Sequence, residues 1–446
     1  MIFIKLAVKI NRNGQNFKVL SNRMDKMTNF RDVLVMQKRE LENFSQKQYA
    51  ARDAELKELD KDIIKVIIGP RRAGKSFFAI HELKKTGNFG YVNFDDESLV
   101  GVENYNDFIE TLDSLYNHPK LLFLDEIQNL PKWELFVNRL QRQGYNLVLT
   151  GSNSNLLSSE LSTHLTGRYI STIIFPFSFK EYFNYSRKTE EATMAEMKAK
   201  LHDYMVKGGY PEPLVKGLDY HEYLRTLHDA ILFKDVVKRH NIRSSRPLGD
   251  LSRFLVSNST SFISYKTLTG LTSLKSVGSI TRYIDFLEEA FLFFKVNAFS
   301  FKYKEQVKSN KKMYTIDNGF ITSRAFNFSG NIGPLFENLV AVELKRRELM
   351  GELEFYYYKN LQGYEVDFVV KRGLEISELI QVCYDVKDEK TRNRETRALL
   401  HGFKDLHCSN LTVITGDYEN TETIEWYGTK GEIKFVPLWK WLLDMN

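Results

Sequence analysis

One glycine-rich segment constrains this chain more than any other feature. It reads Gly69-Pro70-Arg71-Arg72-Ala73-Gly74-Lys75-Ser76 and matches the pattern G-x-x-x-x-G-K-[ST]. A β-branched apolar run, residues 63–68, precedes it, and a helical run beginning at Phe77 follows it. A strand that leads through such a loop into a helix lets backbone N–H groups and the helix N-terminus surround a phosphate. We therefore expect a phosphate-binding loop rather than an ordinary glycine turn.

Each residue of this loop has an expected role in binding a nucleoside triphosphate. Lys75 should reach the β and γ phosphates and also act in catalysis, and the hydroxyl of Ser76 should bind Mg²⁺. We therefore predict ATP and Mg²⁺ as the ligands. The predicted nucleotide-binding set comprises Gly69, Pro70, Arg71, Arg72, Ala73, Gly74, Lys75 and Ser76.

A second motif places two carboxylates at the end of an apolar strand. It reads Leu121-Leu122-Phe123-Leu124-Asp125-Glu126. On its own, such an acidic pair usually caps a helix or lies in a solvated turn. Because it follows a phosphate loop, we expect Asp125 to hold Mg²⁺ through water. We expect Glu126 to polarise the water that attacks the γ phosphate.

The next apolar strand ends in Leu149-Thr150-Gly151-Ser152-Asn153. Hydroxyl and amide groups at this position should lie beside the same phosphate. We take Asn153 as the candidate catalytic sensor residue. The alternative interpretation is an N-cap for the Leu156-Leu157 segment that follows.

The chain is long enough for several domains. Its 446 residues exceed what one hydrophobic core supports, and about 150 residues per domain suggests roughly three units. Apolar residues (43%) and charged residues (27%) are close to the average of folded proteins, which argues against global disorder. Two cysteines cannot build a disulfide framework, and no run approaches the roughly 20 apolar residues that span a bilayer. We expect a cytoplasmic protein with no membrane partner.

The order of apolar runs predicts an α/β multidomain fold. Apolar runs near 63–68, 90–94, 121–124, 146–149 and 170–175 alternate with helical segments, which indicates a parallel sheet covered by helices. Residues 47–60 have the pattern of a charged helix. The predicted division is an N-terminal extension, in part disordered, over 1–45; a P-loop ATPase core over 46–177; a helical lid over 178–245; a winged-helix-like region over 246–305; and an α/β module over 306–446.

Further motifs follow the phosphate loop in a fixed order. They are Leu124-Asp125-Glu126-Ile127-Gln128, Leu149-Thr150-Gly151-Ser152-Asn153, Leu165-Thr166-Gly167-Arg168, Phe175-Pro176-Phe177-Ser178-Phe179-Lys180-Glu181-Tyr182, Gly208-Gly209-Tyr210-Pro211-Glu212 and Phe336-Glu337-Asn338-Leu339-Val340. With these motifs the chain resembles prokaryotic AAA+-type ATPases that carry a restriction-nuclease-like C-terminal domain. The resemblance covers most of residues 45–430. It implies an ATPase core with a parallel sheet, a lid, a winged helix and a nuclease-like terminal module.

The resemblance also implies a role for Arg168. AAA+ proteins often place an arginine near this position, where it reaches the γ phosphate of a neighbouring subunit. Such an arginine finger requires a homo-oligomer. The alternative is a structural arginine that pairs with a carboxylate of the lid.

The terminal module resembles the PD-(D/E)xK nuclease fold, with Glu337 on its first helix and Asp367 on a strand. An active member carries an acid and a lysine on the next strand, where this chain has Gln381 and Cys383. An amide binds a divalent cation less well than a carboxylate, and a thiol has no fixed positive charge. We therefore predict an inactive nuclease fold, unless a nearby lysine such as Lys371 or Lys387 supplies the missing cation.

The partner is open at this stage. Two basic clusters would suit a nucleic-acid backbone, although solvated surfaces explain them equally well. Their members are Lys234, Lys238, Arg239, Arg243 and Arg246, and then Lys302, Lys304, Lys308, Lys311 and Lys312. The leading hypothesis is Mg²⁺-dependent ATP hydrolysis that drives a conformational switch or motor acting on DNA or a client protein. The alternatives are a nucleotide-controlled interaction or signalling module with slow turnover, and an ATP-fuelled nuclease.

Overall fold

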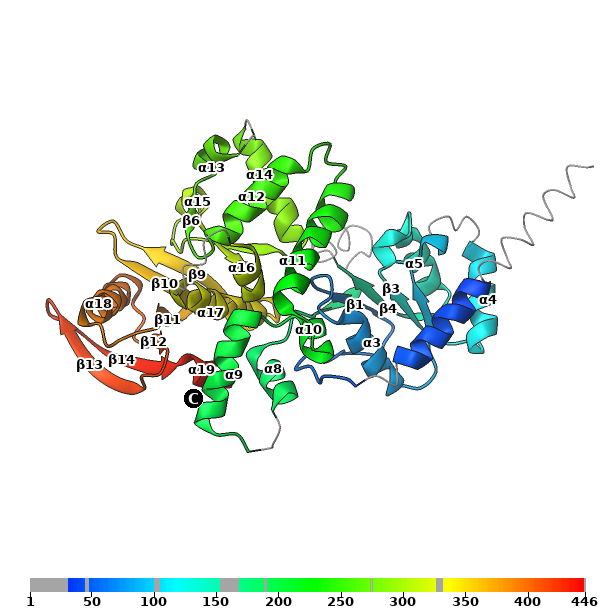
Figure 1. Cartoon of the computed structure of the whole chain (residues 1–446), viewed down its shortest axis with the longest axis horizontal. Helices are drawn as coiled ribbons and strands as arrows, with labels where there is room; N and C mark the ends of the chain where they lie inside the picture. Colours follow the sequence, from blue (N-terminus) through cyan, green and yellow to red (C-terminus); the bar gives the residue numbers. More distant parts are fainter. Residues whose placement is uncertain are drawn as a thin grey trace, which may run out of the picture.

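The structure is a computed structural model that describes residues 31–44, 48–99, 105–152, 168–187, 191–272, 274, 276–325 and 332–444. The described elements form an elongated molecule, with the phosphate loop's sheet at one end, the C-terminal sheet at the other and helices between them (Figure 1). No helix in the described part of the chain is both long enough and apolar enough to cross a bilayer.

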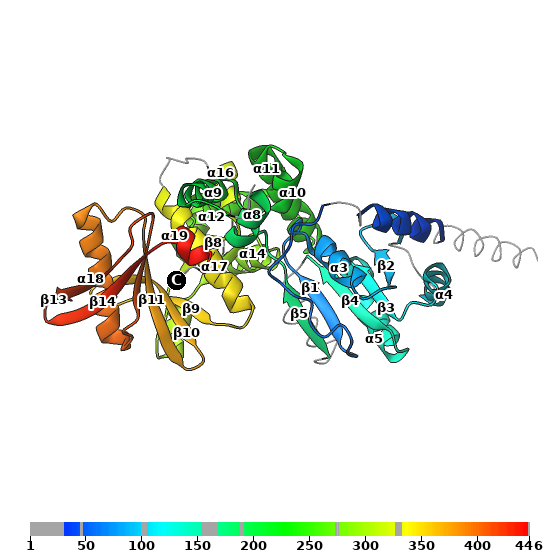
Figure 2. The ribbon, with the colours of Figure 1, turned by 90° about the horizontal axis from the view of Figure 1, so that it is seen from below.

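The N-terminal sheet has five parallel strands in the order β2-β3-β4-β1-β5, as the sequence predicts. Figure 2 shows these strands with α3 and the other helices beside them. The strands are β1 (Ile64–Ile68), β2 (Gly90–Asn93), β3 (Leu121–Asp125), β4 (Asn146–Gly151) and β5 (Tyr169–Ile173). The helices are α3 (Lys75–Lys84), α4 (Tyr105–Tyr116) and α5 (Trp133–Arg142), with short 3₁₀ turns η1 (Glu97–Leu99) and η2 (Ile127–Asn129). Strands β1, β3 and most of β4 are buried, and apart from Lys65 and polar residues at the strand ends they consist of apolar residues.

The segment before β1 differs from the prediction. Residues 48–60, predicted as a charged helix, have no helical structure. Instead, residues 31–44 are helical and pack on the sheet unit, with Leu34 fully buried. The side-chain amide of Gln37 on this helix exchanges two hydrogen bonds with the backbone of Asn93 at the end of β2.

A helical region follows β5. Its elements are α8 (Phe179–Ser186), α9 (Met194–Lys207), α10 (Pro211–Lys216), α11 (Tyr220–Ala230), the π-helix η3 (Ile231–Lys238) and α12 (Arg246–Ser257). Between α9 and α10, Gly208 has a φ of 77°, and a Cβ there would lie 1.9 Å from Oδ1 of Asp317. The carboxylate of Asp317 accepts a hydrogen bond from the backbone of Gly209 at 2.7 Å. The two glycines therefore let this turn dock against residues more than a hundred positions later.

A three-stranded sheet in the order β6-β8-β7 lies beyond the helices. Its elements are β6 (Phe262–Ile263), α13 (Tyr265–Leu271), α14 (Val277–Glu289), β7 (Phe293–Val296), α15 (Tyr303–Lys308), β8 (Lys311–Thr315) and α16 (Asn318–Arg324). Strand β8 pairs with both β6 and β7. The predicted boundary between residues 305 and 306 therefore falls inside one sheet.

The C-terminal unit is a six-stranded mixed sheet in the order β13-β14-β12-β11-β10-β9, with helices. Its elements are α17 (Ile332–Leu349), β9 (Glu354–Lys359), β10 (Glu365–Arg372), β11 (Glu375–Cys383), α18 (Glu389–Leu406), β12 (Leu411–Thr415), β13 (Asn420–Trp426), β14 (Thr429–Pro437) and α19 (Leu438–Leu442). The predicted α/β module is present. Its last hairpin and α19 were not predicted; β13 has no buried residue, and the buried residues of β14 lie only in its second half, so neither strand shows a continuous apolar run.

Candidate active site

The glycine-rich loop joins β1 to α3 and depends on glycine at both ends. Gly69 has a φ of 152°, and a Cβ at this position would lie 2.0 Å from the backbone oxygen of Ile174 after β5. Gly74 has a φ of 95° directly before α3. A side chain would clash at the first glycine and strain the backbone at the second. The loop can therefore turn tightly above the sheet only with glycine at these two positions.

Lys75 and Ser76 begin α3 and point toward the end of β3. The buried ammonium of Lys75 donates to the backbone oxygens of Gly69 and Pro70, at 3.1 and 3.0 Å. Its Nζ lies 3.9 Å from Oε1 of Glu126. The hydroxyl of Ser76 donates to Oδ1 of Asp125 at 2.9 Å. The structure thus brings together the side chains that the sequence assigns to phosphate (Lys75), to magnesium (Ser76 and Asp125) and to the attacking water (Glu126).

Asp125 is the buried centre of this group. Besides the bond from Ser76, its carboxylate accepts hydrogen bonds from the hydroxyls of Thr150 and, at 3.4 Å, Tyr91. Burial and the neighbouring Glu126 raise the pKa of Asp125 to about 6. An acid with a raised pKa gains most from a nearby cation, because a cation favours its charged form.

Glu126 has an unusual backbone conformation, with a φ of 51°. Its N–H donates to the hydroxyl of Thr150 at 2.9 Å, and its carboxylate accepts from the amide of Gln128. Burial alone would raise the pKa of Glu126, but Lys75, Gln128 and Arg71 together hold the pKa below its ordinary value. Glu126 is therefore ionised at neutral pH, as a residue that polarises water must be.

The π-helix η3 and the residue after it bring two more charged side chains to the loop, and neither was predicted in this role from the sequence. Asp235 on η3 accepts a hydrogen bond from Nε of Arg71 in the loop at 3.1 Å. Arg239 follows η3, lies close enough to lower the pKa of Glu126, and has a buried Nη1 with no hydrogen-bond partner among the described residues. Arg239 was predicted as part of a basic surface cluster. The π-helix, which is visible only in the structure, is the feature that marks this region, because π-helical turns are frequent at functional sites.

Two arginines, Arg52 and Arg346, connect the region of the loop to other parts of the chain, and we call this pair the arginine brace. Arg52, in the segment before β1, donates to the backbone oxygen of Ala73 at 2.8 Å and pairs with Glu181 at 2.9 Å. Glu181 also closes the capping box of α8. From the C-terminal unit, Arg346 on α17 donates to the backbone oxygen of Pro176 at 2.7 Å. Arg52 thus links the phosphate loop to α8, and Arg346 links α17 of the C-terminal unit to the segment between β5 and α8.

Arg168 lies far from the loop of its own chain. Its backbone oxygen accepts from Ile64 at the start of β1, whereas the loop follows the other end of that strand. At about 3.3 Å per residue, a five-residue strand separates the two by roughly 16 Å. The Arg168 side chain is exposed, and action on a neighbouring chain stays a prediction. Asn153 lies outside the described residues, but the adjacent Ser152 is buried and its hydroxyl has no described partner.

The residues present fit a magnesium-bound nucleotide. Two buried polar atoms near the loop, Oγ of Ser152 and Nη1 of Arg239, lack partners among the described residues, and buried polar groups normally have one. Ser76 and Asp125 offer the oxygen ligands that Mg²⁺ prefers, while Lys75 and the loop N–H groups offer donors to phosphate. A triphosphate with its metal ion would complete both sets.

A separate acidic centre lies between β8 and the C-terminal sheet. Lys312 on β8 places its buried ammonium 2.8 Å from Glu365, 3.1 Å from Glu337 and 3.3 Å from Asp367. Burial alone would lower the pKa of Lys312, but the surrounding anionic groups hold it above its ordinary value. Burial and the neighbouring Asp367 raise the pKa of Glu337 to about 7 even though Lys312 is close. Lys312 was predicted as part of a basic surface cluster and is instead a buried counter-cation.

Gln381 and Cys383 lie beside this centre. Gln381 accepts from the N–H of Asp367 at 3.2 Å and donates to Glu395 on α18. Burial raises the pKa of the Cys383 thiol to about 12, so it stays neutral. Lys371 pairs with Glu354 at 3.1 Å and Lys387 is exposed, so neither joins the centre in the structure.

Comparisons with known proteins agree with the assignment of the N-terminal sheet and its phosphate loop. Residues 61–183 match the family model described as an AAA domain. Residues 198–329 and 332–441 match two models described as domains of unknown function, DUF8612 and DUF4143. The five-stranded parallel sheet, its loop and this match define the chain as an AAA-type protein with a P-loop NTPase core.

Two curated relatives cover most of the chain. An uncharacterised protein of Methanocaldococcus jannaschii is 35% identical and covers 97% of this chain and 99% of its own length. An uncharacterised protein of Haemophilus influenzae is 32% identical over 81% of this chain and 92% of its own length. The chain belongs to the family of these two proteins.

Solved structures are similar to parts of the chain. One of them is a Walker-type ATPase of Pyrococcus abyssi, with a TM-score of 0.40 and 14% identity, over 63% of this chain and 99% of that chain. The nuclease-like identity of the terminal unit and the winged helix stay predictions, because that part of the chain matches only domains of unknown function.

Proposed function

We propose that this protein binds ATP with Mg²⁺, hydrolyses it, and uses the cycle as a conformational switch or motor acting on DNA or a client protein. One observation carries the proposal. Lys75 and Ser76 come from one motif and Asp125 and Glu126 from another, yet Lys75 lies 3.9 Å from Glu126 and Ser76 lies 2.9 Å from Asp125 at one end of the sheet. A structural role for the loop alone would not require this meeting.

The chain's own residues would act as follows. The loop N–H groups and Lys75 bind and orient the β and γ phosphates. Bound Mg²⁺ would neutralise developing negative charge on the phosphate oxygens, and Ser76 and Asp125 would hold it. Glu126 accepts the proton of the attacking water, because its carboxylate is ionised and is the nearest acidic group to Lys75.

The arginine brace supports the proposal of a switch. Arg52 binds the loop at Ala73 and the lid at Glu181, and Arg346 ties the C-terminal unit to Pro176. A change in loop position on hydrolysis would alter the Arg52 contacts first. Arg52 also donates to the backbone oxygen of Phe175, which is adjacent to the Pro176 that Arg346 contacts. A shift of this segment would therefore move the C-terminal unit.

One observation favours slow turnover, which is the second candidate function. Glu126 is engaged by Lys75 and Gln128, and Arg71 is engaged by Asp235. These groups must exchange partners before water can be activated. A nucleotide-controlled interaction or signalling module would use this restraint to stay in one state for long periods.

The terminal unit is proposed to hold its partner rather than cut it. Phosphodiester hydrolysis needs carboxylates that are free to bind a metal ion. Here Glu337, Glu365 and Asp367 surround the Lys312 ammonium. The ammonium occupies the position that a metal ion would take. An ATP-fuelled nuclease is therefore the third candidate, and it would require Lys312 to leave.

A rate measurement separates the candidates. Phosphate release would be followed in single-turnover and steady-state conditions, with and without duplex DNA. A switch or motor on DNA predicts strong stimulation by DNA. A slow module predicts that a fast first turnover is absent and that DNA changes neither rate.

A further inference from the structure

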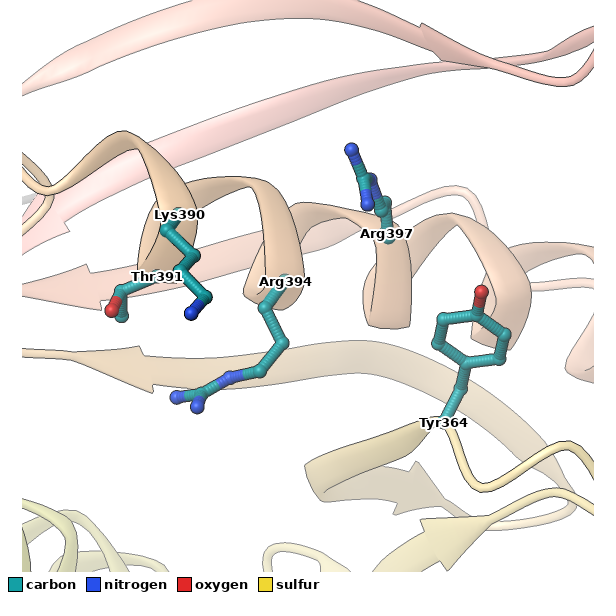
Figure 3. Close-up of a pocket in the computed structure, with 5 residues that line it drawn as sticks. All are labelled: Tyr364, Lys390, Thr391, Arg394 and Arg397. Atoms are coloured by element: carbon teal, nitrogen blue, oxygen red, sulfur yellow. The ribbon is translucent and has the colours of Figure 1, made fainter.

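Basic side chains gather beside α18 and also beside the phosphate loop, but only the second group converges. The first group lines a cavity of about 480 Å³. In Figure 3, Lys390 and Arg394 extend below the helix, whereas Arg397 points to its opposite side, so these three cations do not converge on one ligand. At the phosphate loop, by contrast, the charged groups of the loop meet those of η3.

The loop has two consecutive arginines that diverge toward different lid elements. The Arg71 side chain is 17% exposed and pairs with Asp235 on η3 at 3.1 Å. The Arg72 side chain is 60% exposed and lies 3.7 Å from Glu212 on α10. Arg71 is thus held inward in a largely buried ion pair, whereas Arg72 is mostly in contact with solvent.

Asp235 acts electrostatically on the cations of the loop. Burial would lower the pKa of Arg71, but Asp235 and Glu126 hold it above its ordinary value. Burial lowers the pKa of Lys75, and Asp235 is one of three carboxylates that oppose this shift. Burial raises the pKa of Asp235 itself, and Arg71 and Arg239 limit the rise. The Asp235 carboxylate is therefore a counter-anion of the same cations that a phosphate would meet.

A triphosphate would bring a second anion to Arg71. Burial would raise the pKa of Glu126, and Arg71 is one of the groups that lower it, so Arg71 lies beside the residue assigned to the water at the γ phosphate. Guanidinium groups bind phosphate oxygens as they bind carboxylates. Two anions that share one guanidinium compete for it and repel each other. ADP has no γ phosphate and would leave the pair of Arg71 and Asp235 undisturbed.

We propose that Asp235 and the γ phosphate compete for Arg71, and that Asp235 thereby determines how strongly the site prefers a triphosphate to a diphosphate. ATP takes Arg71 from Asp235, whereas ADP leaves the pair intact. Because this pair joins η3 to the loop, the exchange also breaks that contact when ATP is bound. The proposal deepens the proposed function and rests on nucleotide binding at the loop.

The test is calorimetric binding of ADP and of AMP-PNP, an ATP analogue that keeps a γ phosphate and resists hydrolysis, in the presence of Mg²⁺. The readout is the ratio of the two affinities. Asp235→Asn removes the competing charge, so we expect the preference for AMP-PNP over ADP to rise about ten-fold. Arg71→Gln removes the cation and leaves the carboxylate, so the preference should fall about ten-fold. Asp235→Glu keeps the charge and should behave like the wild-type protein.

Glu212→Gln is the matched control. It also neutralises a carboxylate that pairs with a loop arginine, but Arg72 is largely exposed and Glu212 is bound by Lys216 as well. We expect this variant to keep the wild-type ratio, because exposed ion pairs contribute little. Thermal melting of each variant shows that it is folded. If Asp235→Asn does not fold, Arg71→Gln gives an independent test with the opposite sign.

Three outcomes would overturn the inference. They are an unchanged ratio in both Asp235→Asn and Arg71→Gln, a lower preference for AMP-PNP in Asp235→Asn, and an equal rise in Glu212→Gln. Phosphate release measured on the same samples reports hydrolysis separately. A changed ratio without phosphate release would contradict the proposed hydrolysis alone, and phosphate release with an unchanged ratio would contradict this inference alone. No binding of either nucleotide by the wild-type protein would contradict both.

Discussion

Replacing Lys312 with methionine should destabilise the protein by about 3–5 kcal/mol at pH 7, the usual cost of removing one partner of a buried ion cluster. Methionine is unbranched like lysine and one atom shorter, and it removes the ammonium with its charge and its hydrogen bonds to Glu337 and Asp367. The ammonium has three carboxylates within 3.3 Å. At an effective dielectric constant of about 20, each pair contributes roughly 5 kcal/mol of attraction, most of which offsets the desolvation of the ions. Without the lysine, that desolvation remains uncompensated.

The assay is urea denaturation followed by fluorescence, with Lys311→Met as the matched control. Lys311 is the preceding residue on β8, but its ammonium donates to backbone oxygens, including that of Gln306 at 2.8 Å. We expect Lys311→Met to cost less than about 1 kcal/mol. Equal costs for the two variants would refute the role of Lys312 as a buried counter-cation.

The stability of the Lys312→Met variant should depend on pH in a defined direction. The pKa of Glu337 is already about 7 in the wild-type protein, above its ordinary value, and loss of the lysine raises it further. The folded variant then binds more protons than the unfolded chain, so its stability rises as pH falls from about 7 toward 4.5. Adding Asp367→Asn should recover part of the loss at neutral pH, because it removes one of the unpaired charges.

Three further predictions concern nucleotide and DNA. Lys75→Ala should abolish tight ATP binding, because it removes the loop's buried ammonium; unchanged affinity by calorimetry would contradict the assignment. Arg168→Ala should lower turnover by roughly 10³ to 10⁵ and keep ATP affinity. Mixing the Arg168→Ala protein with the Lys75→Ala protein should restore activity only if Arg168 acts on a neighbouring chain. Arg239 lies beside the loop of its own chain, so mixing Arg239→Ala with Lys75→Ala should restore no activity. Linear, circular and single-stranded DNA should stay intact with Mg²⁺ or Mn²⁺; cleavage lost in Asp367→Ala but kept in Lys75→Ala would establish a nuclease.

The ATPase core was predictable because its signals are local. The strand, loop and helix of the phosphate loop are consecutive, and buried parallel strands leave continuous apolar runs such as Leu121–Asp125. The same reasoning failed for residues 48–60, which have a helical charge pattern but are extended. There Arg52 contacts Ala73, Phe175 and Glu181, and these tertiary contacts outweigh helix propensity.

Three charged groups around the two centres, Lys312, Asp235 and Arg239, were not predictable in these roles, because their partners are distant in sequence. Lys312 meets Glu337 and Asp367, which are 25 and 55 residues later. Asp235 meets Arg71 from 164 residues away. Read along the sequence, Lys312 and Arg239 resemble members of solvated basic clusters. Only the pairing of β8 with β7 and the course of η3 bring them to buried sites.

The measurement that tests the central claim most directly is phosphate release and ATP binding by Glu126→Gln in the presence of Mg²⁺. The substitution keeps the shape of the side chain and removes its basic carboxylate. The account predicts that ATP affinity stays near that of the wild-type protein while hydrolysis falls by a factor of about 10² to 10⁴, the usual contribution of a general base. Wild-type hydrolysis in this variant, or an equal loss of binding and turnover, would contradict it.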